Sequence, residues 1–124
     1  MCYTPGMKVE FYKTPSGRKP VEDFILGLSA GDQGEFAGVK RGIEKYGLKC
    51  PLVIFKNLSG KLWEVKFSGE GGKYRIAYVV ITGPEMVWLH AFKKKTQKTP
   101  KDDLELSLKR MKEVLDHEKA QKNR

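Results

Sequence analysis

Three apolar-rich stretches joined by short turns constrain the fold more than any other feature of this chain. Residues 62–67 (LWEVKF) alternate in polarity, and residues 74–81 and 86–92 form two more apolar stretches of similar length. Glycine-rich residues 68–73 and the turn 82–85 join them. Period-two patterning with such short joins predicts a three-stranded antiparallel meander.

The first half of the chain predicts one strand followed by two helices. Residues 8–13 alternate in polarity, as a short strand does, and Pro20 fits the first position of a helix. Ser29 or a neighbour is placed to cap a second helix, which Gly47 is suited to end. Two short helices in succession predict an N-terminal helical hairpin.

A last helix is expected after Thr99, which precedes Pro100 and is suited to act as the N-cap. The order strand, two helices, three strands, helix predicts a compact α+β fold with an antiparallel sheet and a C-terminal helix. A length of 124 residues suits one domain spanning residues 1–124. Within it, residues 1–7 are expected to be loosely ordered and residues 119–124 to form a basic tail.

The net charge of +9 at pH 7 points to an anionic partner. Nucleic acid, an acidic membrane surface and an acidic protein are all compatible with it, but no helix shows the pattern of a membrane-surface helix. Nucleic acid is therefore favoured, and no membrane partner is expected. The N-terminus carries no visible secretory signal, so a cytoplasmic protein is expected.

No metal site or cofactor is predicted. Cys2 and Cys50 are the two cysteines, and with only His90 and His117 beside them they make no zinc-ligand pattern. His90 lies among apolar neighbours, where a hydrogen-bonded core histidine is commoner than a catalytic one. We expect reduced thiols.

Charged residues of the predicted meander gather into a candidate site. Glu64 and Lys66 are two residues apart on one strand and so share a sheet face, and Arg75 follows across the hairpin. Lys94 lies where the third strand ends. A solvated strand face is the plainer interpretation of Glu64, Lys66 and Lys94, but Arg75 interrupts an apolar strand. Its guanidinium needs either an internal carboxylate such as Glu64 or a bound phosphate.

The same stretches resemble a known family. The chain has Leu-Trp-Glu at 62–64, Tyr-Arg at 74–75, and Phe-Lys-Lys at 92–94 running to Lys-Thr-Pro at 98–100. In this order and spacing they resemble the RelE/HigB superfamily of toxins from type II toxin–antitoxin systems, particularly its phage-derived HigB-like branch. The likeness covers residues 60–112, and the N-terminal half only in the order of its elements.

The resemblance implies a RelE-like fold, also likened to small microbial ribonucleases, and ribosome-dependent cleavage of mRNA in the A site of the 30S subunit. It implies inhibition of translation and neutralisation by a cognate antitoxin, often a helix-turn-helix, HigA-like protein. Lys66, Arg75 and Lys94 fall where RelE-like proteins place basic catalytic residues, and Glu64 falls where RelE has a lysine. The RelE catalytic tyrosine has no equivalent, which leaves the general base open.

A metal-independent endoribonuclease lets the RNA 2′-OH attack the adjacent phosphate. Arg75 is suited to stabilise the negative charge of the phosphorane, with help from Lys66 or Lys94. Glu64 is the candidate base that takes the proton of the 2′-OH. Further lysines of the basic surface are expected to bind RNA: Lys61, Lys73, Lys93, Lys95 and Lys98. Two alternatives stay open: a non-catalytic RNA- or ribosome-binding module, and an inactive toxin-like protein that binds an antitoxin.

Overall fold

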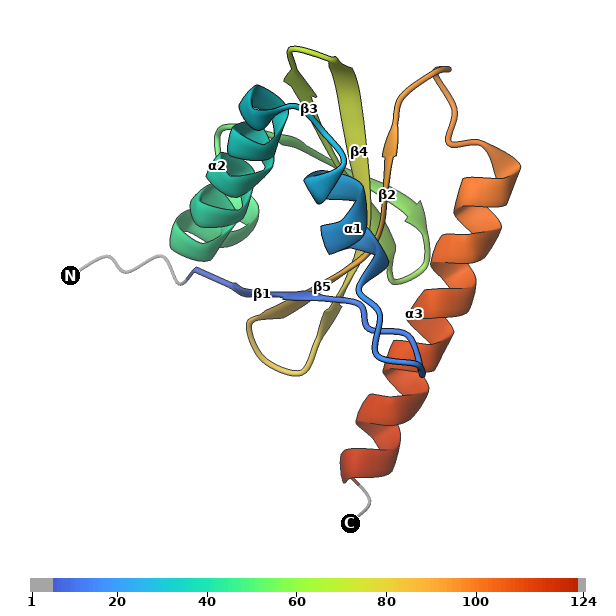
Figure 1. Cartoon of the computed structure of the whole chain (residues 1–124). Coiled ribbons are helices and arrows are strands. Elements are labelled where there is room, and N and C mark those ends of the chain that lie inside the picture. The colour runs from blue at the N-terminus through green and yellow to red at the C-terminus, as the bar shows by residue number, and fades with distance from the viewer. Residues whose placement is uncertain (1–5, 123–124) are drawn as a thin grey trace, which may run out of the picture.

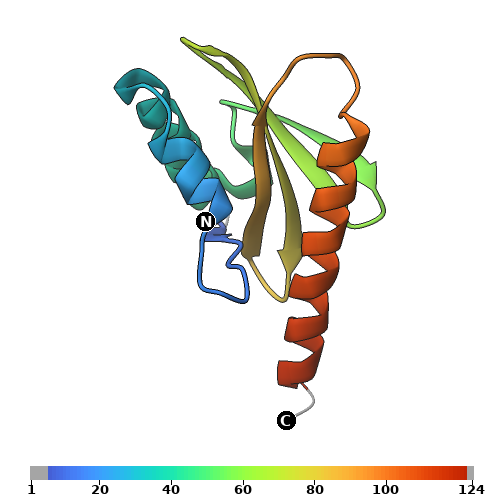
Figure 2. The ribbon, with the colours of Figure 1, turned by 45° about the vertical axis from the view of Figure 1, so that its right-hand side comes forward.

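The computed structural model describes residues 6–122 and places a five-stranded sheet between helices (Figure 1). The elements are β1 (Lys8–Phe11), α1 (Pro20–Leu26), α2 (Ala30–Tyr46), the 3₁₀ turn η1 (Gly47–Lys49), β2 (Ile54–Ser59), β3 (Leu62–Gly69), β4 (Gly72–Ile81), β5 (Glu85–Lys93) and α3 (Lys101–Lys122). The strand order is β1-β5-β4-β3-β2. Figure 2 shows α1 and α2 on one face of the sheet and α3 on the other.

The predicted meander is confirmed as β3, β4 and β5. The strands pair antiparallel, with Lys66 opposite Arg75 and Arg75 opposite Phe92. One register shift lies between Ala77 and Tyr78 of β4, where the ladder with β5 is irregular. The confirmed register brings Lys66 and Arg75 side by side on one sheet face.

The sheet as a whole is mixed, which corrects the prediction of an antiparallel sheet. β1 pairs with β5 in parallel, with Lys8 opposite Glu85. A parallel neighbour requires a long crossover, and here residues 12–84 lie between the two strands. β2 was not predicted, because residues 54–59 (IFKNLS) contain Asn and Ser and lack clean alternation.

The helix signals of the first half are mostly confirmed. Pro20 opens α1, the Ser29 hydroxyl accepts a hydrogen bond from the Asp32 amide at 3.2 Å, and α2 ends at Gly47 with a φ of 62°. A helical hairpin is not clear, because α1 has only seven residues. Thr99 does not act as the predicted cap: α3 begins at Lys101, and the Thr99 hydroxyl binds groups of the sheet.

Each sheet face has its own apolar core. On the α1/α2 face, Phe36 packs edge-on against Phe67 and Tyr74, with ring centroids 4.8 and 5.2 Å apart. On the α3 face, Leu104 and Leu108 pack with the other apolar residues of that helix on the sheet. Burying one such side chain contributes about 1.5–3 kcal/mol, so these two seams fix the helices.

Polar contacts of Arg110 and Glu113 hold the middle of α3 against the rest of the protein. Tyr12 donates a hydrogen bond to Glu113, and the Arg110 guanidinium lies 5.1 Å from the centroid of the Tyr12 ring. Arg110 also donates to the Leu89 carbonyl at 2.9 Å. α3 is therefore held over the sheet by both its apolar seam and these contacts.

The structure describes only part of the two terminal segments for which the sequence made predictions, residues 1–7 and 119–124. Residues 1–5 and 123–124 lie outside the described residues. The Met7 amide donates to the Ile43 carbonyl at 3.3 Å and Met7 packs on the core, so residue 7 is ordered. The predicted tail from residue 119 is helical as far as Lys122. Within the described ranges, no helix combines the length and apolarity that a membrane crossing requires.

Candidate functional site

Four cationic side chains converge on the α3 face of the sheet, next to the β3–β4 hairpin. This basic cluster consists of Lys66, Lys73, Arg75 and Lys94. Lys66 is opposite Arg75 in the β3–β4 ladder, and the Lys94 amide donates to the Lys73 carbonyl at 2.7 Å. Partial burial lowers the pKa of Lys94, and the charges of Lys73, Arg75 and Lys66 lower it further. The cluster therefore attracts anions and eases proton loss from Lys94.

Arg75 is the buried floor of this cluster. Its Nη1 lies 3.5 Å from Glu64 Oε1, and the two side chains are 1% and 0% exposed. Its Nη2 donates to the carbonyls of Thr96 and Gln97 at 3.0 and 2.8 Å. A buried guanidinium needs such partners, and here they come from both a strand and the loop before α3.

Thr99 completes the hydrogen-bond network of Glu64 and Arg75. Its hydroxyl donates to Glu64 Oε2 at 2.7 Å and accepts from Arg75 Nη1 at 3.1 Å. Arg75 therefore has an internal carboxylate as its partner, which was one of the two partners that its position predicted. The network ties the loop of residues 94–99, and with it Lys94, to the sheet.

The geometry separates the four predicted catalytic residues into two groups. Lys66 and Lys94 are half-buried, and solvent reaches both. Glu64 and Arg75 are turned into the protein under Thr99. This favours contact with a substrate for the lysines, and a positioning role for Glu64 and Arg75.

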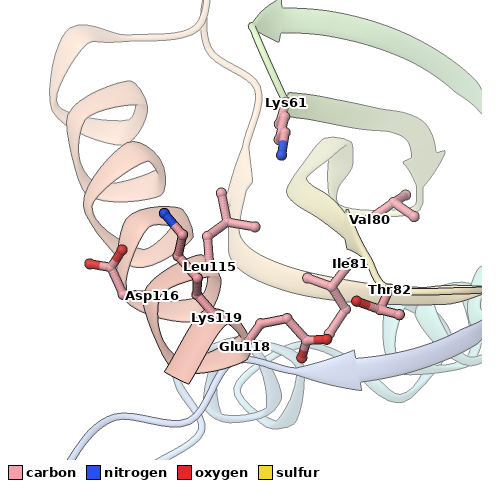
Figure 3. A pocket seen from close by; sticks show the side chains of 8 residues that line it. All are labelled: Lys61, Val80, Ile81, Thr82, Leu115, Asp116, Glu118 and Lys119. Atoms are coloured by element: carbon pink, nitrogen blue, oxygen red, sulfur yellow. The ribbon is translucent and has the colours of Figure 1, made fainter. Parts of the chain in front are cut away.

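The predicted RNA-binding lysines are spread over the molecule. Lys73 belongs to the basic cluster, and Lys95 and Lys98 are exposed in the loop before α3. Lys93 lies on the opposite face, where its charge lowers the pKa of Asp32. Lys61 is at the far end of the sheet, in a hollow of about 460 Å³ between the sheet and the end of α3. Figure 3 shows it across this hollow from Leu115 and Lys119.

Asp32 is a site-building residue that the sequence did not reveal. It accepts hydrogen bonds from the amides of Glu70 and Gly71 at 2.6 and 2.8 Å and from the Tyr74 hydroxyl. The Tyr74 bond contributes most to lowering the pKa of Asp32, with the two amides helping and burial opposing. The sequence signal is ambiguous, because an Asp three residues after an N-cap Ser is common in any helix.

The hairpin glycines fit this clamp. A Cβ at Gly69 would lie 2.5 Å from Asp32 Oδ1, and one at Gly71 would lie 2.6 Å from Oδ2. The carboxylate thus sits where only glycine leaves room. Asp32 fixes the hairpin that leads directly into Lys73.

His90 is tied to α3. Its Nε2 lies 2.7 Å from Asp103 Oδ1, and its ring stacks on Phe92 with centroids 5.1 Å apart. The ring is half-buried, on the same sheet face as the basic cluster. His117 is exposed near the end of α3.

The aromatic side chains of the sheet, a residue type that can stack on RNA bases, differ in exposure. Tyr74, Tyr78 and Trp88 are buried in the core on the α1/α2 face. Trp63 remains 37% exposed. In residues 6–122, no group of three His, Cys, Asp or Glu side chains is arranged to hold a metal ion.

Fold and site together define a small basic α+β protein with an anion-attracting cluster beside a clamped hairpin. Residues 23–112 match the family model of phage-derived Gp49-like proteins (DUF891), a family associated with RelE-like toxins. The chain belongs to this Gp49-like family. No curated protein matches it.

Proposed function

We propose that this protein is the toxin of a type II toxin–antitoxin system, an endoribonuclease that cuts mRNA on the ribosome and so inhibits translation. The basic cluster supports the proposal: three solvent-accessible lysines stand over a buried Arg75, and the pKa of Lys94 is lowered. Family membership and the resemblance to RelE-like toxins agree with it.

The proposed reaction uses groups of the RNA and of this chain, with water as the acceptor of one proton. The 2′-OH attacks the adjacent phosphorus, the bond to the 5′-oxygen breaks, and the products are a 2′,3′-cyclic phosphate and a 5′-OH. Lys94 gives a proton to the leaving 5′-oxygen, because its lowered pKa eases proton loss, and water takes up the proton that the 2′-OH releases. Lys66 and Lys73 stabilise the extra negative charge of the phosphorane.

Glu64 and Arg75 act through position in this mechanism. Arg75 holds the carbonyls of Thr96 and Gln97, and this fixes the loop that carries Lys94. Its positive charge also helps to lower the pKa of Lys94. The ribosome is the proposed partner that orients the mRNA. Cations lower the barrier to cleavage far more when the phosphate is held in position than when it is free.

The test is expression of the chain in bacteria with mapping of new 5′ ends in mRNA. The informative variant is Lys94→Arg, which keeps the charge but removes the titratable amine. We expect it to retain binding and to lose cutting by about 10²–10⁴-fold, as the loss of an acid–base group does. Lys109→Ala, on an exposed position of α3, is the matched control and is expected to cut normally.

Normal cutting by both Lys94→Arg and Lys66→Ala would contradict the proposal. A second candidate is a non-catalytic RNA- or ribosome-binding module, favoured by the burial of Glu64, which removes the carboxylate from the accessible site. Growth arrest with intact mRNA would select this candidate.

A further inference from the structure

An apolar groove lies at the end of the sheet opposite the basic cluster, and on the other face. It has a volume of about 510 Å³ and is formed where α2 and η1 stop short of covering β2, β3 and β4. We call it the β2 groove. It is lined by Leu48, Phe55, Lys61, Trp63, Tyr78 and Val80.

Several apolar side chains in and around the β2 groove face solvent. Leu48 is 56% exposed, Trp63 is 37% exposed and Val80 is 36% exposed. Single exposed apolar residues are ordinary, but a contiguous group around a hollow is typical of a binding surface. β2 is also an edge strand, so one side of its backbone is free for pairing.

The charge in the lining of the β2 groove has one sign. The lining contains Lys61 and no Asp or Glu, and Lys49 directly follows the lining residue Leu48 in η1. Lys61 lines the groove and makes no ion pair with any part of the chain that the structure describes. Asp116 and Glu118 lie in the separate hollow on the α3 side of Lys61. Apolar walls with a lysine rim fit a ligand that is apolar and acidic.

Two other occupants fit less well. A second copy of this chain would bring like-charged rims together, and each copy carries a net charge of +9. RNA needs cations along its backbone, whereas a single lysine lines this groove. Of its three aromatic residues, Tyr78 is buried and Phe55 is packed against the core, so they offer bases little surface for stacking.

We propose that the β2 groove docks a segment of a partner protein in which acidic residues alternate with apolar ones. The apolar side chains enter between Leu48, Trp63 and Val80, and the carboxylates pair with Lys61 and Lys49. This surface is separate from the basic cluster, so the inference stands whether or not the protein cuts RNA.

The two tryptophans make the test specific. Trp63 lines the groove and is partly exposed, whereas Trp88 is fully buried, so a change in fluorescence on binding reports the groove. The probe is a synthetic peptide of Glu interspersed with Leu and Phe, and its counterpart carries Lys at every Glu position. We expect a saturable blue shift with the acidic peptide alone, lost in Trp63→Phe.

Charge reversal then tests the rim. Lys61→Glu is expected to weaken binding on the order of tenfold, while Lys109→Glu, the same change on the exposed side of α3, leaves it unchanged. Circular dichroism checks that each variant is folded.

Four results would overturn the inference. The acidic peptide leaves the emission of Trp63 unchanged, or the basic peptide binds equally well. The third result is that a single-stranded RNA oligonucleotide shifts the emission of Trp63. The fourth is that the emission and the sedimentation coefficient of the protein alone change with protein concentration, as binding of a second copy would cause.

Discussion

The two ends of the sheet handle charge and apolar surface in opposite ways. At the hairpin end, Glu64 and Arg75 are fully buried and are bonded to the loop before α3, while Asp32 is bonded to the hairpin. At the other end, the β2 groove leaves apolar side chains in water and has the exposed Lys61 in its lining. Burying an ion pair costs several kcal/mol per ion before any attraction is counted.

This difference separates folding from recognition. The buried pair stabilises one conformation of the loop that carries Lys94, and its loss therefore harms the fold. The groove residues Leu48, Trp63 and Val80 are partly in water before any partner binds, so they contribute less to folding than the buried Tyr78 beneath them. The hairpin end is thus expected to be intolerant of change, and the groove end tolerant.

The largest expected effect is that of Arg75→Ala. It leaves Glu64 as an unpaired buried charge and frees the carbonyls of Thr96 and Gln97, so we expect a loss of about 3–5 kcal/mol in the free energy of unfolding. Urea denaturation measures it.

The double variant Glu64→Leu with Arg75→Met is the matched control. It removes both charges and keeps apolar volume, so it is expected to be closer to the parent than Arg75→Ala. A single variant as stable as the parent would show that the pair does not hold this end.

The second effect concerns the clamp at Asp32. Its pKa is lowered in the folded state, so its contribution to stability is complete above its ordinary value of 3.8 and is lost as the pH falls through the lowered value. Asp32→Asn is expected to flatten this acid-side fall in the free energy of unfolding.

Amide exchange gives a local measurement of the same clamp. The Glu70 and Gly71 amides lose a charged acceptor in Asp32→Asn, so their exchange is expected to accelerate on the order of tenfold or more. Unchanged exchange at both amides would contradict a role for Asp32 in fixing the hairpin.

The smallest effect is expected in the groove. Leu48→Ser replaces a side chain that is mostly in water, so the free energy of unfolding should change by about 0.5 kcal/mol or less. Urea denaturation measures this change as well. A loss in the free energy of unfolding as large as that of Arg75→Ala would contradict the contrast between the two ends.

The parts of the fold that the sequence predicts are those with local signals. The meander follows from alternating polarity and glycine-rich joins, and α2 follows from Ser29 and Gly47 at its ends. The parallel pairing of β1 with β5 has no local signal, because it joins residues 8–11 to residues 85–88, far apart in the sequence. The edge strand β2 buries little of itself, so selection for alternating apolar residues is weak there.

In the candidate site too, the sequence predicts what has a local signal and misses contacts between distant segments. The neighbouring positions of Lys66 and Arg75 follow from strand register, and the need of Arg75 for a partner follows from its apolar strand. That Thr99 lies over Glu64 depends on where the loop before α3 passes, which no spacing encodes. For that reason Thr99 looks like an ordinary N-cap in the sequence, and Glu64 like an exposed strand residue.

The parallel pairing of β1 with β5 also orders events during synthesis. β1 emerges from the ribosome first, yet its partner strand is made only after β2, β3 and β4. The amide groups of residues 8–11 therefore wait without their sheet partner while most of the chain is translated. A nascent chain arrested before β5 is left with an unfinished sheet edge, open to chaperones and proteases.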